Sequence, residues 1–266
     1  MNGEGVGPGG PGGAWIQVAL NGARGAAEGA AVPMSPQALA ESALGAVAAG
    51  AREVLVHPRT PCGRESLSPR VVGPVLEALR GAGVSVPLSV PVSVAAEPDP
   101  VGRLERVRSW VVLPERAVVR WAEPGARELA SALLARGVAV DAVVRVEEGR
   151  WEAGAWVGAA RAGRVRLVGE PAQADPALVA GSAAGLAAGL VAVLGRPPSV
   201  PWMLFGREAA AWPVLRLAAR CGAGARIGVG EVLSLPDGRP AHSNAELVAA
   251  AVREWARAAT TTAGTR

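Results

Sequence analysis

Short apolar runs recur along this chain, and longer segments separate them. There are eight runs: Trp15–Leu20, Glu53–His57, Val84–Val94, Ala117–Trp121, Val138–Val146, Arg164–Val168, Val200–Phe205 and Ala225–Val229. Runs that are apolar almost throughout are typical of strands buried on both faces, as in a parallel sheet. The pattern therefore predicts eight buried parallel β-strands.

The segments between the runs carry helical signals. The predicted helices are Pro36–Ala49, one from Pro69, one from Pro100, Pro124–Arg136, Trp151–Ala162, Pro176–Leu194, Glu208–Arg220 and Asn244–Ala258. Ser35 and Asp99 stand where an N-cap is expected, each before a proline that suits the first helical position. Ser243-x-x-Glu246 forms a capping box before the last helix.

Eight strand–helix units in about 245 residues are typical of a single-domain α/β fold, the (β/α)8 TIM barrel. A doubly wound open sheet is the alternative. Residues 1–13 are mostly glycine and small residues, which predicts a flexible tail, because such a segment buries too little to offset its ordering entropy. Residues 259–266 are assigned to a second tail, so that 14–258 form the barrel domain.

The composition excludes several classes of protein. All 27 basic residues are arginine, they are interspersed with acids, and the net charge is only +4. This scatter argues against a nucleic-acid-binding protein. Two cysteines argue against a disulfide framework or a zinc ribbon. We find no signal peptide and no membrane-spanning run, so we expect a cytoplasmic protein without membrane contact.

In a TIM barrel the site lies where strands end, so the residues after each run are the candidates. His57 ends the second run, where it is either a metal ligand and acid–base group or a hydrogen-bonded rim residue. Arg59 follows two residues later. Arg226 and Glu231 flank the eighth run, where they could bind an anion and move a proton, or form a plain salt bridge.

Other polar residues near strand ends carry weaker signals. Arg24 follows the first run and is positioned to reach the barrel mouth. Cys62 is a candidate soft metal ligand. Glu170, after the sixth run, is interpreted as a solvated loop charge, and His242 as a surface residue.

Several stretches together, in order along the chain, resemble the β-keto acid cleavage enzymes, typified by 3-keto-5-aminohexanoate cleavage enzyme. They are NGAR at 21–24, AVPMSPQALA at 31–40, AGAREVLVHPR at 49–59, CGRESL at 62–67, EPDP at 97–100, WAEPGARELA at 121–130, AWPVLRLAA at 211–219 and RIGVGEVLSLPDGRPAHSNAELV at 226–248. The resemblance implies an oligomeric TIM barrel that uses Zn2+ as a Lewis acid. The implied reaction converts a β-keto acid and acetyl-CoA into acetoacetate and a new acyl-CoA.

The resemblance also assigns residues, with replacements. The family's H-x-H metal pair is Leu55 and His57 here, and its R-x-G-x-E-D segment places Gly230 at the ligand glutamate and Glu231 at the following aspartate. Metal binding would therefore rest on His57, with Glu231 and Cys62 as speculative ligands. Other family positions are replaced by Arg120 and Phe205. Glu231 and Arg226 are the catalytic candidates, and Arg24, Arg59 and Arg226 the candidates for substrate binding.

Three hypotheses follow. The chain is an active cleavage enzyme for a small β-keto acid and a CoA thioester, or a catalytically impaired paralogue with an arginine-lined anion pocket, or a metal-free enzyme with altered chemistry. The pocket of the second hypothesis would be lined by Arg24, Arg59, Arg120 and Arg226. Because two of three metal ligands are replaced, we expect weak or absent zinc binding. A homo-oligomer, or pairing with a homologue, is expected.

Overall fold

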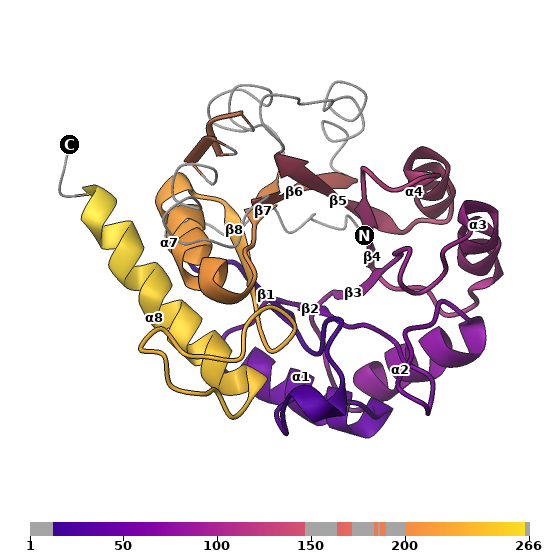
Figure 1. Cartoon of the computed structure of the whole chain (residues 1–266), viewed down its shortest axis with the longest axis horizontal. Coiled ribbons are helices and arrows are strands. Elements are labelled where there is room, and N and C mark those ends of the chain that lie inside the picture. The colour runs from indigo at the N-terminus through magenta and orange to yellow at the C-terminus, as the bar shows by residue number, and fades with distance from the viewer. Residues whose placement is uncertain (1–12, 147–163, 172–183, 186, 190–200, 264–266) are drawn as a thin grey trace, which may run out of the picture.

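The structure is a computed structural model that describes residues 13–146, 164–171, 184–185, 187–189 and 201–263. Eight parallel strands follow one another around a closed barrel, and β8 pairs with β1 (Figure 1). The strands are β1 (Ile16–Ala19), β2 (Glu53–Leu55), β3 (Leu88–Pro91), β4 (Arg116–Arg120), β5 (Ala139–Val146), β6 (Val165–Pro171), β7 (Trp202–Leu204) and β8 (Gly224–Ile227). The closed ring confirms the predicted TIM barrel and excludes the open sheet.

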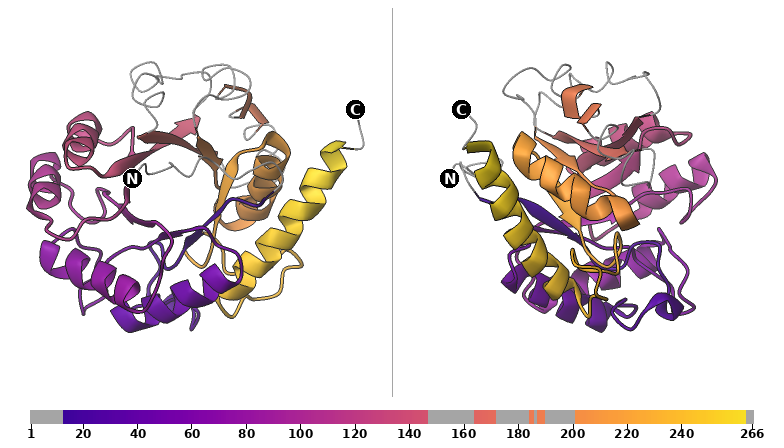
Figure 2. Two further views of the ribbon diagram at one scale, coloured as in Figure 1. Left: turned by 180° about the vertical axis from the view of Figure 1, so that it is seen from behind. Right: turned by 60° about the vertical axis from the view of Figure 1, so that its left-hand side comes forward.

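The described helices lie outside the ring of strands in all the views (Figures 1 and 2). Those described are α1 (Pro36–Ala48), α2 (Pro69–Gly81), α3 (Pro100–Ser109), α4 (Ala126–Ala135), α7 (Ala211–Cys221) and α8 (Asn244–Ala263), with short 3-10 helices η1 (Ala26–Glu28) and η2 (Glu208–Ala210). The segments predicted as helices at 151–162 and 176–194 lie wholly or mostly outside the described residues. No described helix is both long and apolar enough to cross a bilayer.

The predicted caps are in place. The Ser35 hydroxyl accepts from the Ala38 N–H at 3.1 Å, and the Asp99 carboxylate accepts from two N–H groups of the first turn of α3. The Ser243 hydroxyl accepts from the Glu246 N–H at 3.1 Å, whereas the Glu246 carboxylate accepts from the His242 N–H at 2.8 Å. The last helix therefore starts with one half of the predicted capping box.

Several predicted boundaries are wrong. The run at 84–94 contributes only Leu88–Pro91 to the barrel, because residues 84–87 serve to connect α2 to the strand and Pro87 has no N–H to donate. The last helix continues to Ala263, so residues 259–263 are helical rather than part of a tail. The Thr260 hydroxyl donates to carbonyls of the preceding turn there. The seventh helix begins at Ala211, after a 3-10 turn.

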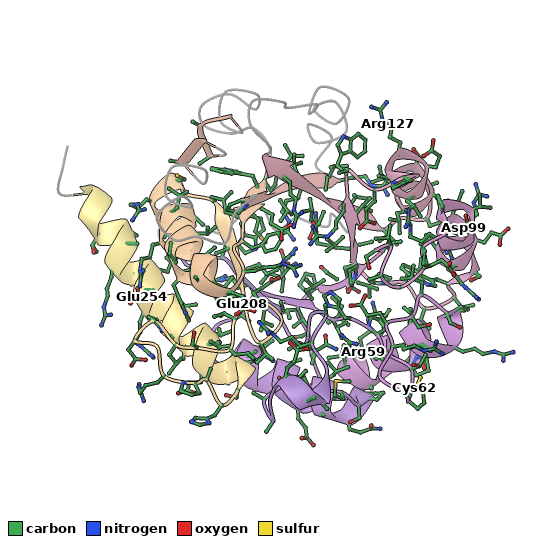
Figure 3. The ribbon with its side chains drawn as sticks, viewed as in Figure 1. Arg59, Cys62, Asp99, Arg127, Glu208 and Glu254 are labelled. Atoms are coloured by element: carbon green, nitrogen blue, oxygen red, sulfur yellow. The ribbon has the colours of Figure 1, made fainter. Side chains whose placement is uncertain are left out.

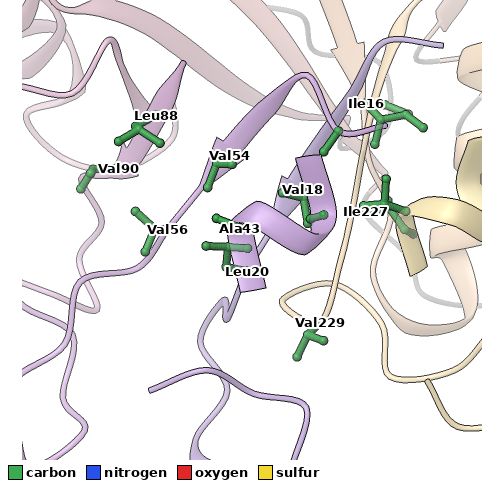
Figure 4. Close-up of a cluster of buried hydrophobic side chains, with 14 of the residues drawn as sticks. Ile16, Val18, Leu20, Ala43, Val54, Val56, Leu88, Val90, Ile227 and Val229 are labelled. Carbon is green, nitrogen blue, oxygen red and sulfur yellow. The ribbon is translucent and has the colours of Figure 1, made fainter. Parts of the chain in front are cut away.

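Side chains that point outward from the strands form the larger core. Figure 4 shows Ile16 and Val18 of β1, and Leu20 just after it, in one cluster with Ala43 of α1. Side chains of β2, β3 and β8 belong to the same cluster. All of these side chains are buried. Burial of each large aliphatic side chain contributes about 1.5–3 kcal/mol, so the helices are fixed on the barrel by apolar contact.

Side chains that point inward form layers along the barrel axis. Near the strand starts, the Arg166 guanidinium donates to both Glu53 oxygens at 2.7 Å and to Asp141. Above this charged layer lies a small apolar layer formed by Ala19, Leu55, Val118, Val143, Val168, Met203 and Phe205. Polar side chains follow at the strand ends, so the apolar layer is the floor of the barrel mouth.

Candidate active site

The mouth gathers one histidine, four arginines and two carboxylates from five of the eight strand ends. They are His57, Arg59, Arg120, Glu170, Arg207, Arg226 and Glu231. Parallel strands bring their carboxyl ends to one face of the barrel, so residues far apart in sequence meet there.

His57 is held through its backbone. The side-chain amide of Asn21, at the end of β1, donates to the His57 carbonyl at 2.9 Å and accepts from the His57 N–H at 3.0 Å. Burial and then the charges of Arg59, Arg226, Arg207 and Arg120 lower the pKa of His57 to about 3. The imidazole is therefore neutral at physiological pH. Its buried Nδ1 has no hydrogen-bond partner among the described residues.

Arg226 is fixed from below. Its Nε donates to Gln17 Oε1 at 2.6 Å, and Gln17 in turn donates to Glu53 at 3.0 Å. Its guanidinium stacks on Phe205, 4.5 Å from the ring centre. The buried Nη2 has no partner in the described part of the chain. One donor of an oriented, buried guanidinium is therefore left for a ligand.

Glu231 lies beside Arg226, with 4.0 Å between Arg226 Nη1 and Glu231 Oε1. Its side chain is only 4% exposed, and Oε2 has no hydrogen-bond partner among the residues described, although Arg207 Nε lies 3.5 Å away. Burial raises the pKa of Glu231 above its ordinary value, although Arg207 and Arg226 oppose the shift. A carboxyl whose pKa is raised by burial is suited to exchange protons near neutral pH.

Glu170 is buried, so its interpretation as a solvated loop charge is wrong. It accepts from Arg120 at 2.7 Å and lies 3.0 Å from Arg207 Nε. Burial by itself would raise the pKa of Glu170, but the charges of these arginines outweigh burial and lower it. Glu170 is inward-facing because β6 extends to Pro171, three residues beyond the predicted end at Val168.

Arg207 was not singled out from the sequence. It lies in the turn after β7, which is tight: Glu208 has φ 49°, unusual for a residue other than glycine, and its N–H donates to the Glu231 carbonyl at 2.9 Å. A backbone held in this region is typical of functional sites. The sequence signal that could have pointed to Arg207 is its place two residues after Phe205, the end of the seventh apolar run.

Two predicted substrate-binding arginines have protein partners at the rim. Arg24 pairs with the exposed carboxylates of Glu28 and Glu208, and its Nε donates to the Val229 carbonyl at 2.7 Å. Arg59 donates to the Gly22 and Gly63 carbonyls at 2.7 and 2.6 Å, its side chain is 6% exposed, and its Nη2 lies 3.8 Å from Glu65 Oε1. Arg24 is therefore neutralised locally, whereas Arg59 ties two rim loops together.

Cys62 is exposed, and its thiol lies 3.1 Å from the Thr60 hydroxyl. This hydrogen bond, with those from Arg64, lowers the pKa of Cys62 to about 7. Figure 3 shows Arg59 closer to the ring of strands than Cys62. His242 is exposed, as predicted.

The residues at the mouth do not fit a zinc ion. Among the residues that the structure describes, no three His, Cys, Asp or Glu side chains form a group that could hold a metal. Leu55 belongs to the apolar floor. A Cβ at Gly230 would lie 2.7 Å from the Gly22 nitrogen, so no side chain fits there without moving the first strand–helix loop. His57 and the two carboxylates of the mouth, Glu170 and Glu231, form no such group, so the described residues do not supply the three protein ligands of a catalytic zinc site.

Comparisons with known proteins agree with this architecture. A family model described as beta-keto acid cleavage enzyme matches residues 14–265. A search of curated proteins gives no match. Among solved structures, apo ObcA aligns over 88% of this chain and 61% of its own, at 14% identity and TM-score 0.57. The chain thus spans under two thirds of ObcA.

Two other structures share the fold along most of their length. Type I 3-dehydroquinate dehydratase from Clostridium difficile aligns over 92% of both chains, at 11% identity and TM-score 0.56. Dihydropteroate synthase from Yersinia pestis, in a sulfonamide drug complex, aligns over 95% of both chains, at 15% identity and TM-score 0.55. At such identities these likenesses concern the fold alone.

Proposed function

Because the chain belongs to the beta-keto acid cleavage enzyme family, we propose that its barrel mouth binds a β-keto acid and exchanges its acyl part with a CoA thioester without a divalent cation. One observation carries the proposal. The buried Arg226 and Glu231 each present an atom without a hydrogen-bond partner among the described residues, beside a neutral His57. Buried polar atoms left unpaired indicate a missing ligand or water.

Arg226 binds the anionic end of the substrate. A guanidinium recognises a carboxylate through parallel N–H donors, and such hydrogen bonds are stronger when buried. Gln17 and Phe205 hold the guanidinium in one orientation. Arg207 and Arg120 add positive charge that stabilises the enolate formed from the keto acid.

Glu231 moves the proton. The carboxylate removes one proton from the carbon between the ketone and the carboxylate of the substrate, leaving an enolate. The enolate carbon attacks the thioester carbonyl, and CoA leaves as the thiolate. The thiolate adds to the original ketone, the adjacent C–C bond breaks, and Glu231 returns the proton to the departing enolate. With acetyl-CoA, a keto acid becomes an acyl-CoA and acetoacetate, so atoms and charge balance.

The structures of ObcA support a substrate of this class. ObcA has been solved with oxaloacetate, itself a β-keto acid, and with a C4-CoA adduct and oxalate. These three ligands were bound to ObcA. They make oxaloacetate a reasonable first member of a substrate panel for this chain.

The second candidate is an impaired paralogue that binds the same anions without turnover. The apolar Leu55 and the tightly packed Gly230 favour it, because they replace family metal ligands. In that case Arg226 and its neighbours form an anion-binding site only. Association as a homo-oligomer, or with an active homologue, is part of either proposal.

The deciding experiment is an exchange assay in excess chelator. Purified protein is given acetyl-CoA and a panel of β-keto acids, and new acyl-CoA is measured by mass spectrometry. We expect turnover that Glu231→Gln lowers by roughly 10²–10⁴-fold, whereas the exposed control Glu128→Gln leaves it unchanged. Calorimetry with the same keto acids distinguishes the candidates: binding that Arg226→Met abolishes, without turnover, identifies the impaired paralogue. Activity that appears only after zinc is added contradicts the metal-free proposal.

A further inference from the structure

Two cavities open on the face of the barrel where the strands end. The first, of about 400 Å³, lies between the starts of α1 and α2 and includes Arg59 and Arg70. The second, of about 510 Å³, lies against the loop before α8 and includes Glu28 and Glu208. Both fall in the size range of ligand pockets, roughly 300–1,000 Å³.

Their charges are opposite. The first cavity has two guanidinium groups and no carboxylate in its lining, while the second has two carboxylates and one histidine. Two helices of 13 residues begin at the first cavity, so their positive dipole ends add to the field of the arginines. Arg24 pairs with both carboxylates of the second cavity, and Arg59 of the first lies 3.8 Å from the Glu65 carboxylate, so these charges are partly balanced. Arg70 and the two helix starts still make the first cavity the more positive of the two and the better site for an anion.

The first cavity also has an apolar surface. Met34, Pro61, Val71, Pro74 and Val75 line it beside the arginines. An aromatic ring that carries phosphates, as in a nucleotide, needs this combination: flat apolar contact for the ring and guanidinium donors for the phosphates.

Arg59 connects this cavity to the barrel mouth. Its side chain lines the cavity, yet its Nη2 donates to Gly22 at the mouth, and its charge is among those that lower the pKa of His57. Its buried Nε has no partner in the described part of the chain. Arg59 therefore borders both the cavity and the mouth.

We propose that the cavity between α1 and α2 binds the 3′-phosphoadenosine diphosphate part of the CoA thioester. This inference rests on the proposed function, because it identifies where the second substrate binds. The adenine packs on the prolines and valines, and Arg70 binds phosphate. The pantetheine arm then passes Arg59 and brings the thioester to the mouth.

Direct binding tests the inference independently of turnover. Calorimetry measures the affinity of wild type, Arg70→Ala and Arg70→Glu for acetyl-CoA, for adenosine 3′,5′-bisphosphate and for acetyl-pantetheine, which lacks the nucleotide. Arg70 is exposed, so its replacement leaves the core intact. The control is Arg253→Ala, another exposed arginine, on α8.

Loss of one charge-assisted hydrogen bond predicts about tenfold weaker acetyl-CoA binding in Arg70→Ala, and a larger loss in Arg70→Glu. The affinity for the bisphosphate should fall in parallel. The affinity for acetyl-pantetheine should not change in the Arg70 variants, and the control variant should bind all three ligands as wild type does. Equal acetyl-CoA affinity in Arg70→Glu and wild type, or no binding of either nucleotide to wild type, overturns the assignment. Nucleotide binding in this pattern without turnover leaves the cavity assigned and contradicts only the catalytic proposal.

Discussion

At the scale of single residues, the mouth holds two ionisable groups whose pKa values move in opposite senses. Burial lowers the pKa of His57 and raises that of Glu231, because burial disfavours the charged form of each. Both groups are thereby biased toward their uncharged forms. Four guanidinium groups surround these two residues, so the site is a positive environment for an anion.

The lowered pKa of His57 predicts a pH dependence of stability. Unfolded protein protonates this histidine below pH 6.5, whereas the folded protein does so only near pH 3, so stability is complete above pH 6.5 and falls as the pH drops between these values. Between pH 7.5 and 5, wild type should lose about 2 kcal/mol more of its free energy of unfolding than His57→Gln does. Urea denaturation at both pH values measures the difference. Parallel losses would show that His57 titrates normally.

The raised pKa of Glu231 predicts the acid limb of the pH–rate profile. The base must be ionised, so kcat should rise with pH through a pKa above the ordinary glutamate value. Glu231→Asp, which keeps the carboxylate but shortens its reach, should retain this limb at a lower rate. An acid limb at the ordinary carboxyl value would contradict a buried base.

At the scale of elements, the loops after β1 and β8 pack backbone against backbone. A Cβ at Gly22 would lie 2.6 Å from Gly230 Cα, and one at Gly230 would lie 2.9 Å from Gly22 Cα. The Gly230 N–H donates to the Ala19 carbonyl at 3.0 Å. The contact fixes the position of the following Glu231, and it leaves no room for a ligand side chain at 230.

This close approach predicts that Gly230→Ala is destabilising. Forcing a methyl group into a packed contact costs about 1–3 kcal/mol, and more where a backbone must shift. Gly81→Ala is the control, because a Cβ at the end of α2 meets nothing within 4 Å. Thermal unfolding should show a lower Tm for the first variant only; equal Tm values would mean that the two loops separate easily.

At the scale of the whole molecule, buried charges link opposite sides of the barrel. Arg166 of β6 pairs with Glu53 of β2 and Asp141 of β5, and Asp141 also accepts from Arg116 at 2.6 Å. Gln17 joins this layer to Arg226 and therefore to the mouth. The charged layer thus sets the orientation of a guanidinium that faces the substrate.

Removing a carboxylate from this charged layer should lower the free energy of unfolding. Asp141→Asn removes the carboxylate that Arg166 and Arg116 share, so Arg166 keeps Glu53 but Arg116 loses its ion pair with Asp141. Removing one partner of a buried pair costs about 3–5 kcal/mol. Chemical denaturation measures the loss. The matched control is Asp237→Asn. Loss of its exposed ion pair with Arg239 should leave the denaturation midpoint unchanged. A small loss at Asp141 would indicate that water enters the barrel.

The sequence by itself determined eight buried strands that alternate with capped helices, which left the TIM barrel and the doubly wound sheet as alternatives until the closed ring decided between them. Ser35 and Asp99 were predictable as caps because a capping side chain and the N–H groups that it satisfies lie within three residues of each other. His57, Arg226 and Glu231 were also predictable as strand-end residues. Local pattern carries this information, since strand ends meet at one face of any TIM barrel.

Only the tertiary structure decided which charges meet. Glu170 had no local signal of burial, and Arg207 none of function, because both depend on where β6 and the turn after β7 are placed by the ring. The contact between Gly22 and Gly230 joins residues from opposite ends of the chain. Charge pairing and close packing across a barrel are long-range properties, so strand order and register, rather than residue type, determine them.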